Sequence, residues 1–325
     1  MKPPYTITGK ILRLVASISE KIGEINVAHL YKPPTELRKK NRIQTIHSSL
    51  QIEGNMLTIG QVTAILEHKK VAGPEKDILE VKNAIRAYER MNNFKPNSLT
   101  SFCKAHRILM KGLLESPGKL RSRSVGIVKG SELAHIAPKG EIVKALMNNL
   151  FKYLKHDKDI SLIKSCVFHY EVEFIHPFLD GNGRMGRLWQ TVILRNTYPV
   201  FEFLPIEQLI KEKQVEYYIS LEKSDKTGQS TPFIEFMLGI INKSLEEMLN
   251  TQNISLTSME RMELFRTIAK KGSFTRKDFL RQFKEISTAT ASRDLKLGAK
   301  NKIIKKTGDK NLAKYKFIAR KPSPF

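Results

Sequence analysis

The stretch HPFLDGNGRMGR, residues 176–187, places a histidine, a carboxylate, three glycines and two arginines within twelve positions. Gly181, Asn182 and Gly183 sit where a loop turns into a helix, and free backbone N–H groups at a helix N-terminus form an anion site that the helix dipole reinforces. Glycine also lets the backbone approach an anion closely. The segment is therefore expected to bind phosphate.

The charged side chains of this segment suit a polyphosphate. Arg184 and Arg187 are three residues apart, so they project permanent charge onto one side of the first helical turn. Asp180 is a hard oxygen ligand suited to Mg²⁺ that bridges phosphates. Histidine titrates near neutral pH, so His176 suits the removal of a proton from an attacking group.

The combination predicts phosphoryl or nucleotidyl transfer from a Mg-bound nucleoside triphosphate, with His176 as the base. A single histidine is more often a hydrogen-bonded core residue than a catalytic one. The neighbouring glycines, carboxylate and arginines are what favour a catalytic role for His176. The sequence lacks GxxxxGK[ST], which disfavours a P-loop enzyme.

Helices must position these residues, because apolar side chains recur at helical spacing along most of the chain. Thr58 and Gln61 form a capping box that predicts a helix start. The other predicted helices of the first 250 residues span 8–29, 36–55, 77–91, 97–114, 161–174, 182–196, 210–223 and 231–249. The period changes in SVGIVKGSELAHIAP, 124–138, where β-favouring runs either side of Gly130 predict a hairpin.

Composition places the chain among ordinary globular proteins, with 41% hydrophobic and 27% charged residues. The N-terminus has no apolar core of signal-peptide length, and no apolar run approaches about 18 residues. The two cysteines, Cys103 and Cys166, lack metal-like spacing and predict buried thiols in a reducing compartment. A cytoplasmic protein without membrane contact is expected.

The formal net charge is +24, and the last 71 residues carry 19 Lys plus Arg against 6 Asp plus Glu. That excess indicates either a polyanion-binding module or a solvated, colloidally stable surface. Predicted helices at 258–271, 275–285 and 287–300, followed by two strands around Gly308 and Asp309, favour a winged helix-turn-helix.

In a winged helix-turn-helix the third helix enters the major groove of DNA. This would place Thr288, Thr290, Arg293 and Lys296 near DNA. An ordinary solvated helix face is the alternative.

HPFLDGNGRMGR matches the HxFx(D/E)GNGRxxR signature of the Fic family at every fixed position, and the chain resembles this family from about residue 35 to 245. The resemblance implies a mainly α Fic fold with the 124–138 hairpin as a flap. It also implies transfer of AMP from ATP to a Ser, Thr or Tyr hydroxyl of a protein, with release of pyrophosphate. Intact GNGR favours AMP over phosphate, while UMP stays open.

The resemblance also implies roles for the signature residues. His176 would deprotonate the target hydroxyl, and Asp180 would hold Mg²⁺. Gly181, Asn182 and Gly183 would cradle the α- and β-phosphates. Arg184 would stabilise the developing charge, and Arg187 would grip the γ-phosphate. The flap edge could hold a target segment by strand addition, although a purely structural hairpin is the alternative.

A second motif lies on the helix predicted at 36–55. Ser49 and Glu53 are four apart, hence on one face, and the dipole disfavours a carboxylate in the last turn, so a distant partner is expected. SLQIEG resembles the (S/T)xxxE(G/N) inhibitory motif of Fic proteins, whose glutamate pairs with the second signature arginine, here Arg187. The resemblance implies autoinhibition by blocked seating of the γ-phosphate. An exposed glutamate at a helix end is the alternative.

The predicted organisation is a helical region at 1–95 with the inhibitory motif, a catalytic core at 96–250 and a winged-helix domain at 255–325. The predicted function is Mg-dependent protein adenylylation, with DNA and a second copy of the chain as further partners. Two alternatives stay open. Relatives that use the inhibitory glutamate to position a water suggest removal of AMP, and the basic segment suggests a DNA-binding regulator that senses nucleotide.

Overall fold

A computed structural model describes residues 2–27, 35–123, 126–129, 132–252, 258–269, 272–283, 286–308 and 313–318. Contacts within the chain divide it into two compact units, Met1–Asn250 and Thr251–Phe325. Each unit has its own cluster of buried apolar side chains. A separation of 1–95 from 96–250 stays a prediction.

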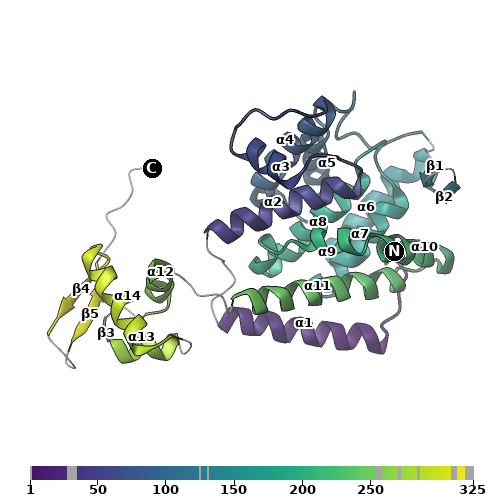
Figure 1. The fold of residues 1–325 in the computed structure, drawn as a ribbon. Helices are drawn as coiled ribbons and strands as arrows, with labels where there is room; N and C mark the ends of the chain where they lie inside the picture. The colour runs from purple at the N-terminus through teal and green to yellow at the C-terminus, as the bar shows by residue number, and fades with distance from the viewer. Residues whose placement is uncertain are drawn as a thin grey trace. The chain divides into compact units, whose positions relative to one another are not determined.

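The first unit is mainly helical, as predicted, with one two-stranded sheet (Figure 1). Its helices are α1 (Gly9–Val27), α2 (Thr35–Ile52), α3 (Ile59–Leu66), α4 (Glu75–Glu89), α5 (Leu99–Leu109), α6 (Gly140–His156), α7 (Ser161–Ile175), α8 (Asn182–Thr197), α9 (Ile206–Glu212), α10 (Gln214–Thr227) and α11 (Thr231–Gln252). Short 3-10 helices, η1 (Met91–Asn93) and η2 (Pro199–Glu202), follow α4 and α8.

Helices α7 and α8 pack against each other at the centre of this unit. Gly186 permits the close approach, because a Cβ there would lie 2.6 Å from the Cδ2 atom of His169 on α7. Helix α8 is buried nearly all round, including the polar side chains in its first two turns. The loop that joins the two helices, 176–181, is therefore anchored in the core at both ends.

Helix α2 brings the second motif to this centre, since it packs on α9, α3, α4 and α8. Its apolar side is set by Ile43, Ile46 and Leu50, all buried. The predicted capping box at the start of α3 is confirmed: Thr58 accepts a hydrogen bond from the Gln61 backbone, and the Gln61 side chain accepts one from the Thr58 backbone.

Helix α6 lies where no helix was predicted, and α9 overlaps the helix predicted at 210–223 only in its last three residues. Helix α6 follows the hairpin directly and buries Val143, Met147, Leu150 and Leu154 at spacings of four, three and four. That pattern is an ordinary amphipathic one. Helix α9 has seven residues, which is too short for the period to stand out from its surroundings.

The predicted hairpin is confirmed by strands β1 (Gly126–Lys129) and β2 (Glu132–Ile136). They pair antiparallel, with Ile127 opposite His135 and Val128 opposite Leu133, and the register shifts between these two pairs. Gly130 lies outside the described residues.

The second unit runs α12 (Ser258–Ile268), β3 (Ser273–Thr275), α13 (Arg276–Gln282), α14 (Thr288–Lys300), β4 (Ile304–Thr307) and β5 (Lys314–Phe317). The three helices and the last two strands occur where the sequence predicts them. The short strand β3 was not predicted, and it pairs with β5 to give the sheet order β3-β5-β4. Ser287 caps α14 by accepting a hydrogen bond from the Thr290 backbone. Asp309 lies outside the described residues.

Both cysteines are free thiols, and the predicted burial is confirmed for Cys166, whereas Cys103 is only half-buried. Along the described ranges, no helix combines the length and the apolar character needed to cross a bilayer.

Candidate active site

His176 ends α7 in a left-handed backbone conformation, with φ 49° and ψ 60°. That conformation costs a residue with a Cβ roughly 1–2 kcal/mol, so neighbouring contacts must hold it. The His176 backbone N–H donates to the Val172 carbonyl at 3.0 Å, and its own carbonyl accepts from the Arg121 Nε at 2.6 Å. The backbone at the predicted base is therefore fixed from both sides.

The Asn182 side chain closes the loop that follows. Its Oδ1 accepts from the Phe178 backbone N–H at 2.8 Å, and its Nδ2 donates to the Phe178 carbonyl at 2.9 Å. Asn182 is 1% exposed. Its side chain is thus used to shape the loop, and only its backbone is placed to meet a phosphate at the start of α8. Contact with nucleotide stays a prediction.

His106 contacts the same loop through ring stacking and a hydrogen bond. Its ring stacks on Phe178 with centroids 3.6 Å apart. The Gly118 N–H donates to His106 Nδ1 at 2.8 Å, which leaves Nε2 to carry the proton and donate to the Asp180 carbonyl at 2.9 Å. Burial lowers the pKa of His106 to about 4, which fits a neutral ring.

Glycine is needed at two positions of the signature. Gly181 has φ 84°, and a Cβ there would lie 2.8 Å from the Met110 sulfur. Gly183 faces the second motif, because a Cβ there would lie 2.6 Å from Glu53 Oε1. The start of α8 is therefore approached closely by other groups on both sides.

Arg184 is 5% exposed and lies between two carboxylates. Its Nη2 donates to Asp180 Oδ1 at 3.0 Å and its Nη1 donates to Glu80 Oε1 at 3.1 Å. The Gly181 N–H also donates to Asp180 Oδ1, at 2.5 Å. The other Asp180 oxygen takes part in none of these contacts.

The Asp180 carboxylate suits a magnesium ion that is also bound by phosphate groups. The Asp180 side chain is half exposed, and Mg²⁺ is usually bound by one or two carboxylates together with phosphate oxygens and water. Within the described part of the chain, no group of three or more His, Cys, Asp or Glu side chains could hold a metal on its own. Asp180 would thus share the ion with the nucleotide.

Arg187 is 2% exposed and is held by the second motif. Its Nη2 donates to Glu53 Oε1 at 2.7 Å and to the Ser49 carbonyl at 3.0 Å, and its Nε donates to Ser49 Oγ at 3.1 Å. Burial opposes the charge of Arg187, yet the Glu53 carboxylate holds the pKa of this arginine above its ordinary value. The second motif and the second signature arginine are therefore in direct contact.

Behind this contact, α9 places Glu207 under α2. Glu207 is 1% exposed and accepts a hydrogen bond from the Tyr88 hydroxyl at 3.1 Å. Burial raises the pKa of Glu207 to about 7, although Tyr88 and the charge of Arg187 act against the rise. The carboxyl group therefore keeps its proton well into the neutral range.

Glu207 makes stability depend on pH. Because its pKa of about 7 in the folded chain exceeds the ordinary 4.5, the folded state holds the proton more tightly, and stability falls as pH rises from 4.5 to 7. The shift corresponds to about 3 kcal/mol. We expect Glu207→Gln to remove this loss, as measured by urea unfolding at pH 5 and pH 8. Glu212→Gln, on the exposed end of α9, should leave the parent's pH dependence intact, and an unchanged profile in Glu207→Gln would contradict the assignment.

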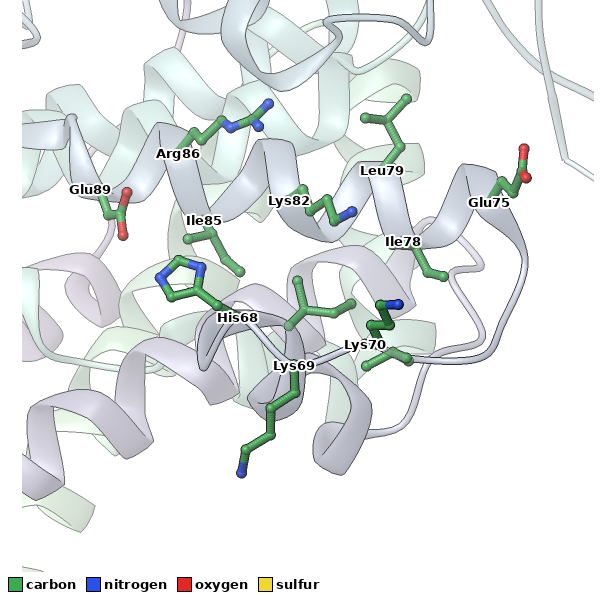
Figure 2. Close-up of a pocket in the computed structure, with 12 residues that line it drawn as sticks. His68, Lys69, Lys70, Glu75, Ile78, Leu79, Lys82, Ile85, Arg86 and Glu89 are labelled. Atoms are coloured by element: carbon green, nitrogen blue, oxygen red, sulfur yellow. The ribbon is translucent and has the colours of Figure 1, made fainter.

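A groove of about 810 Å³ lies elsewhere, between α4 and the segment that follows α3 (Figure 2). Its apolar floor and basic rim are formed by Ile65, Val71, Ile78, Leu79 and Ile85 and by His68, Lys69, Lys70, Lys82 and Arg86, with Glu75 and Glu89 also lining it. No residue of 176–187 lines this groove. It is therefore distinct from the site around α8.

Among the predicted site residues of the first unit, the structure brings Asp180 together with Arg184, and Ser49 and Glu53 together with Arg187. The four predicted DNA-contacting residues lie in the second unit. Sequence analysis missed Glu80 and Arg121, which contact the signature from 104 and 55 positions away along the chain. No local pattern marks either one, because each reads as an ordinary charged residue.

A model of the Fic/DOC family matches residues 96–194. A crystal structure of a Fic family protein from Desulfovibrio desulfuricans G20 is 38% identical and covers 99% of both chains, with a TM-score of 0.75. The chain therefore belongs to the Fic family, and the predicted Fic fold is confirmed.

Curated relatives carry the name Protein adenylyltransferase Fic. The protein from Drosophila grimshawi is 28% identical over 247 residues, which are 72% of this chain and 48% of the relative. The one from Nematostella vectensis is 28% identical over 273 residues, 78% of this chain and 60% of the relative. The chain thus spans about half the length of the first of these. Fic-1 from Caenorhabditis elegans, 20% identical over 76% of this chain and 74% of that one, shares the fold with a TM-score of 0.63.

Proposed function

We propose that this protein is an adenylyltransferase that moves AMP from Mg-ATP to a hydroxyl group of a protein. The observation that carries the proposal is the complete Fic signature, with His176 on the loop that leads into the buried N-terminus of α8. The name of the curated relatives supports the same activity.

In the proposed reaction, the target hydroxyl oxygen attacks the α-phosphorus of ATP. The bond between that phosphorus and the bridging oxygen to the β-phosphate breaks, and pyrophosphate leaves. His176 accepts the hydroxyl proton. The N–H groups at the start of α8 and the guanidinium of Arg184 stabilise the charge that develops on the phosphate oxygens. Magnesium held by Asp180 would neutralise phosphate charge.

Target binding is proposed at the flap. Strands β1 and β2 form a two-stranded sheet, so an extended target segment could add to a strand edge through main-chain hydrogen bonds. The His176 loop is tied to the segments flanking this hairpin, because Arg121 donates to the carbonyls of Arg123 and Pro138 as well as to that of His176. Arg121 would thus fix the position of the flap relative to His176.

Autoinhibition by Glu53 is part of the proposal. The contacts of Glu53 with Nη2 and of Ser49 with Nε support it, because these two donors of Arg187 would then not be available to a γ-phosphate. Removal of AMP with Glu53 placing a water is the alternative use of the same carboxylate. A cytoplasmic location and a homodimer remain predictions.

Label transfer distinguishes the proposed reaction from other phosphate chemistry. We expect Glu53→Gly to attach label from α-³²P-ATP to protein in a lysate, and mass spectrometry should show an added AMP. His176→Ala should transfer none, and because kinases of the lysate also use γ-³²P-ATP, it gives the background for that label. Label from the γ-phosphate above this background, or equal α-labelling by His176→Ala, would contradict the proposal. Loss of AMP from modified protein would favour the reverse reaction.

A second candidate function, DNA binding, is favoured by the second unit. Its order of helices followed by a β-hairpin supports a winged helix, and Thr288, Arg293 and Lys296 are exposed on α14 with Thr290 partly so. Arg293 and Lys296 would add positive charge to a major-groove face.

Salt dependence tests this second function. If phosphates are neutralised, the logarithm of the affinity for duplex DNA should fall linearly with the logarithm of salt concentration, by about 0.9 per phosphate contact. Arg293→Ala with Lys296→Ala should flatten that slope by about 2 in fluorescence anisotropy. Lys95→Ala, an exposed change in the first unit, serves as the control. A shallow slope in the parent protein would rule DNA binding out.

A further inference from the structure

Glu80 is a carboxylate on α4 that contacts the signature from outside it. It is 7% exposed, and each of its oxygens has its own partner. Oε1 accepts from Arg184 Nη1 at 3.1 Å, and Oε2 accepts from Asn55 Nδ2 at 2.8 Å. Burying a carboxylate costs free energy unless hydrogen bonds and a charged partner compensate, so these contacts distinguish Glu80 from a surface charge. Bonded on both oxygens, the carboxylate orients the groups that it binds.

Asn55 follows the inhibitory motif directly and is 6% exposed. Its Oδ1 accepts from the Leu57 N–H at 3.1 Å, and its Nδ2 also donates to the Asp77 carbonyl at 3.2 Å. The Met56 N–H donates to the Asp77 carboxylate at 2.9 Å. The turn after α2 is therefore fastened to α4 at the place where Glu80 points to the signature.

The guanidinium of Arg184 is planar, and two carboxylates fix that plane, Glu80 at Nη1 and Asp180 at Nη2. Its Nε is buried and has no hydrogen-bond partner among the residues that the structure describes. An unmatched buried donor costs about 1–3 kcal/mol, which an anionic oxygen would recover. The direction of this donor depends on Glu80, because Asp180 is half exposed and less constrained.

We propose that Glu80 is a positioning residue for Arg184 and that Asn55 acts through Glu80. The inference rests on the proposed AMP transfer. The inhibitory segment then acts on both signature arginines: Ser49 and Glu53 hold Arg187, while Asn55, two residues further on, sets Arg184 through Glu80. Release of this segment would change the two arginines together.

Kinetics in the Glu53→Gly background test the positioning role without interference from the inhibitor. We expect Glu80→Gln to lower kcat at least tenfold and to change KM for ATP less than threefold, because Arg184 acts on charge that develops in the transition state. Glu89→Gln, an exposed change on the same helix, should match the Glu53→Gly protein. A change confined to KM, or a kcat per folded molecule that does not fall, would overturn the proposal.

A double-mutant cycle tests whether Asn55 acts through Glu80. Asn55→Ala should lower kcat about fivefold when Glu80 is present and cause no further loss in Glu80→Gln. Independent roles would instead give losses that multiply, and such a result would overturn the relay.

A spectroscopic readout keeps the inference separate from the proposed function. The Nε–H signal of Arg184 in ¹H–¹⁵N spectra, assigned by its loss in Arg184→Lys, should shift in Glu80→Gln. It should also shift in Asn55→Ala, but not when Asn55→Ala is added to Glu80→Gln. A signal unmoved by Glu80→Gln would overturn the inference. If Glu53→Gly transfers no AMP, the proposed function fails, while this spectrum still decides the role of Glu80.

Discussion

Replacing Glu53 by glycine is expected to raise AMP transfer by about a hundredfold to a thousandfold. Glu53 accepts a hydrogen bond from Nη2 of Arg187 at 2.7 Å, and Arg187, which is 2% exposed, is the residue proposed to bind the γ-phosphate. Breaking a buried ion pair by removing one partner typically costs 3–5 kcal/mol, so the freed arginine gains much by binding a phosphate. Initial rates with α-³²P-ATP measure the effect.

The same substitution should lower the unfolding free energy while activity rises. Arg187 stays buried without its carboxylate, but the Glu53 side chain is 26% exposed, so the cost falls below that of a fully buried pair. We expect a loss of about 2 kcal/mol in urea unfolding, which a bound ATP analogue should restore. Glu53→Gln, which keeps an acceptor oxygen without the charge, should fall between parent and Glu53→Gly. Glu36→Gln, an exposed change in the first turn of α2, should change neither quantity. Equal activity of Glu53→Gly and the parent would dismiss the inhibitory contact.

Replacing Arg121 by methionine is expected to lower kcat about a hundredfold. Arg121 is 5% exposed, and among the residues that the structure describes its guanidinium donates to the backbone carbonyls of His176, Ile175, Pro138 and Arg123, at 2.6 to 2.9 Å. Burial lowers the pKa of Arg121. Without these bonds the His176 backbone can leave its left-handed conformation, and a base displaced by about 1 Å loses much of its effect.

The Arg121 result separates positioning from simple destabilisation. We expect a loss of about 3 kcal/mol in unfolding free energy, because several buried carbonyls lose a charged donor. KM for ATP should change little, since the backbone at the start of α8, where phosphate binding is proposed, is held by Asn182 instead. Arg121→Lys should recover part of the stability and little of kcat, because one ammonium cannot span the same carbonyls. Arg90→Met, an exposed change at the end of α4, is the control, and full kcat in Arg121→Met would exclude the positioning role.

Most helices of this protein could be predicted from the sequence, because helical periodicity and capping depend on residues that are close together in the chain. The capping box at Thr58, the cap at Ser287 and the helix that starts at Asn182 are of this kind. The contact between Glu53 and Arg187 was expected only because the motif resembles a known one, since 134 positions separate the two residues.

Contacts set by tertiary packing were not predictable. Arg121 binds four carbonyls, and carbonyls are present at every residue, so no sequence pattern marks its partners. Glu80 reads as one more charge on a helix rich in charge, and only the fold reveals that it faces inward. The phosphate contact predicted for the Asn182 backbone stays a prediction, whereas the bonds of its side chain to Phe178, which complete the loop, had no signal in the sequence.

Because Glu53 lies close to Gly183, the proposed inhibition would be a competition between two anions for one place. A carboxylate oxygen already rests over the first turn of α8, where the positive end of the helix dipole lies. In the proposed inhibition, Glu53 is a tethered anion that competes with a free anion for this place, and its strength is an effective concentration set by the geometry of α2. Such a competition has a threshold: the enzyme would respond to the size of the cellular nucleotide pool, and any partner that shifts α2 would reset that threshold.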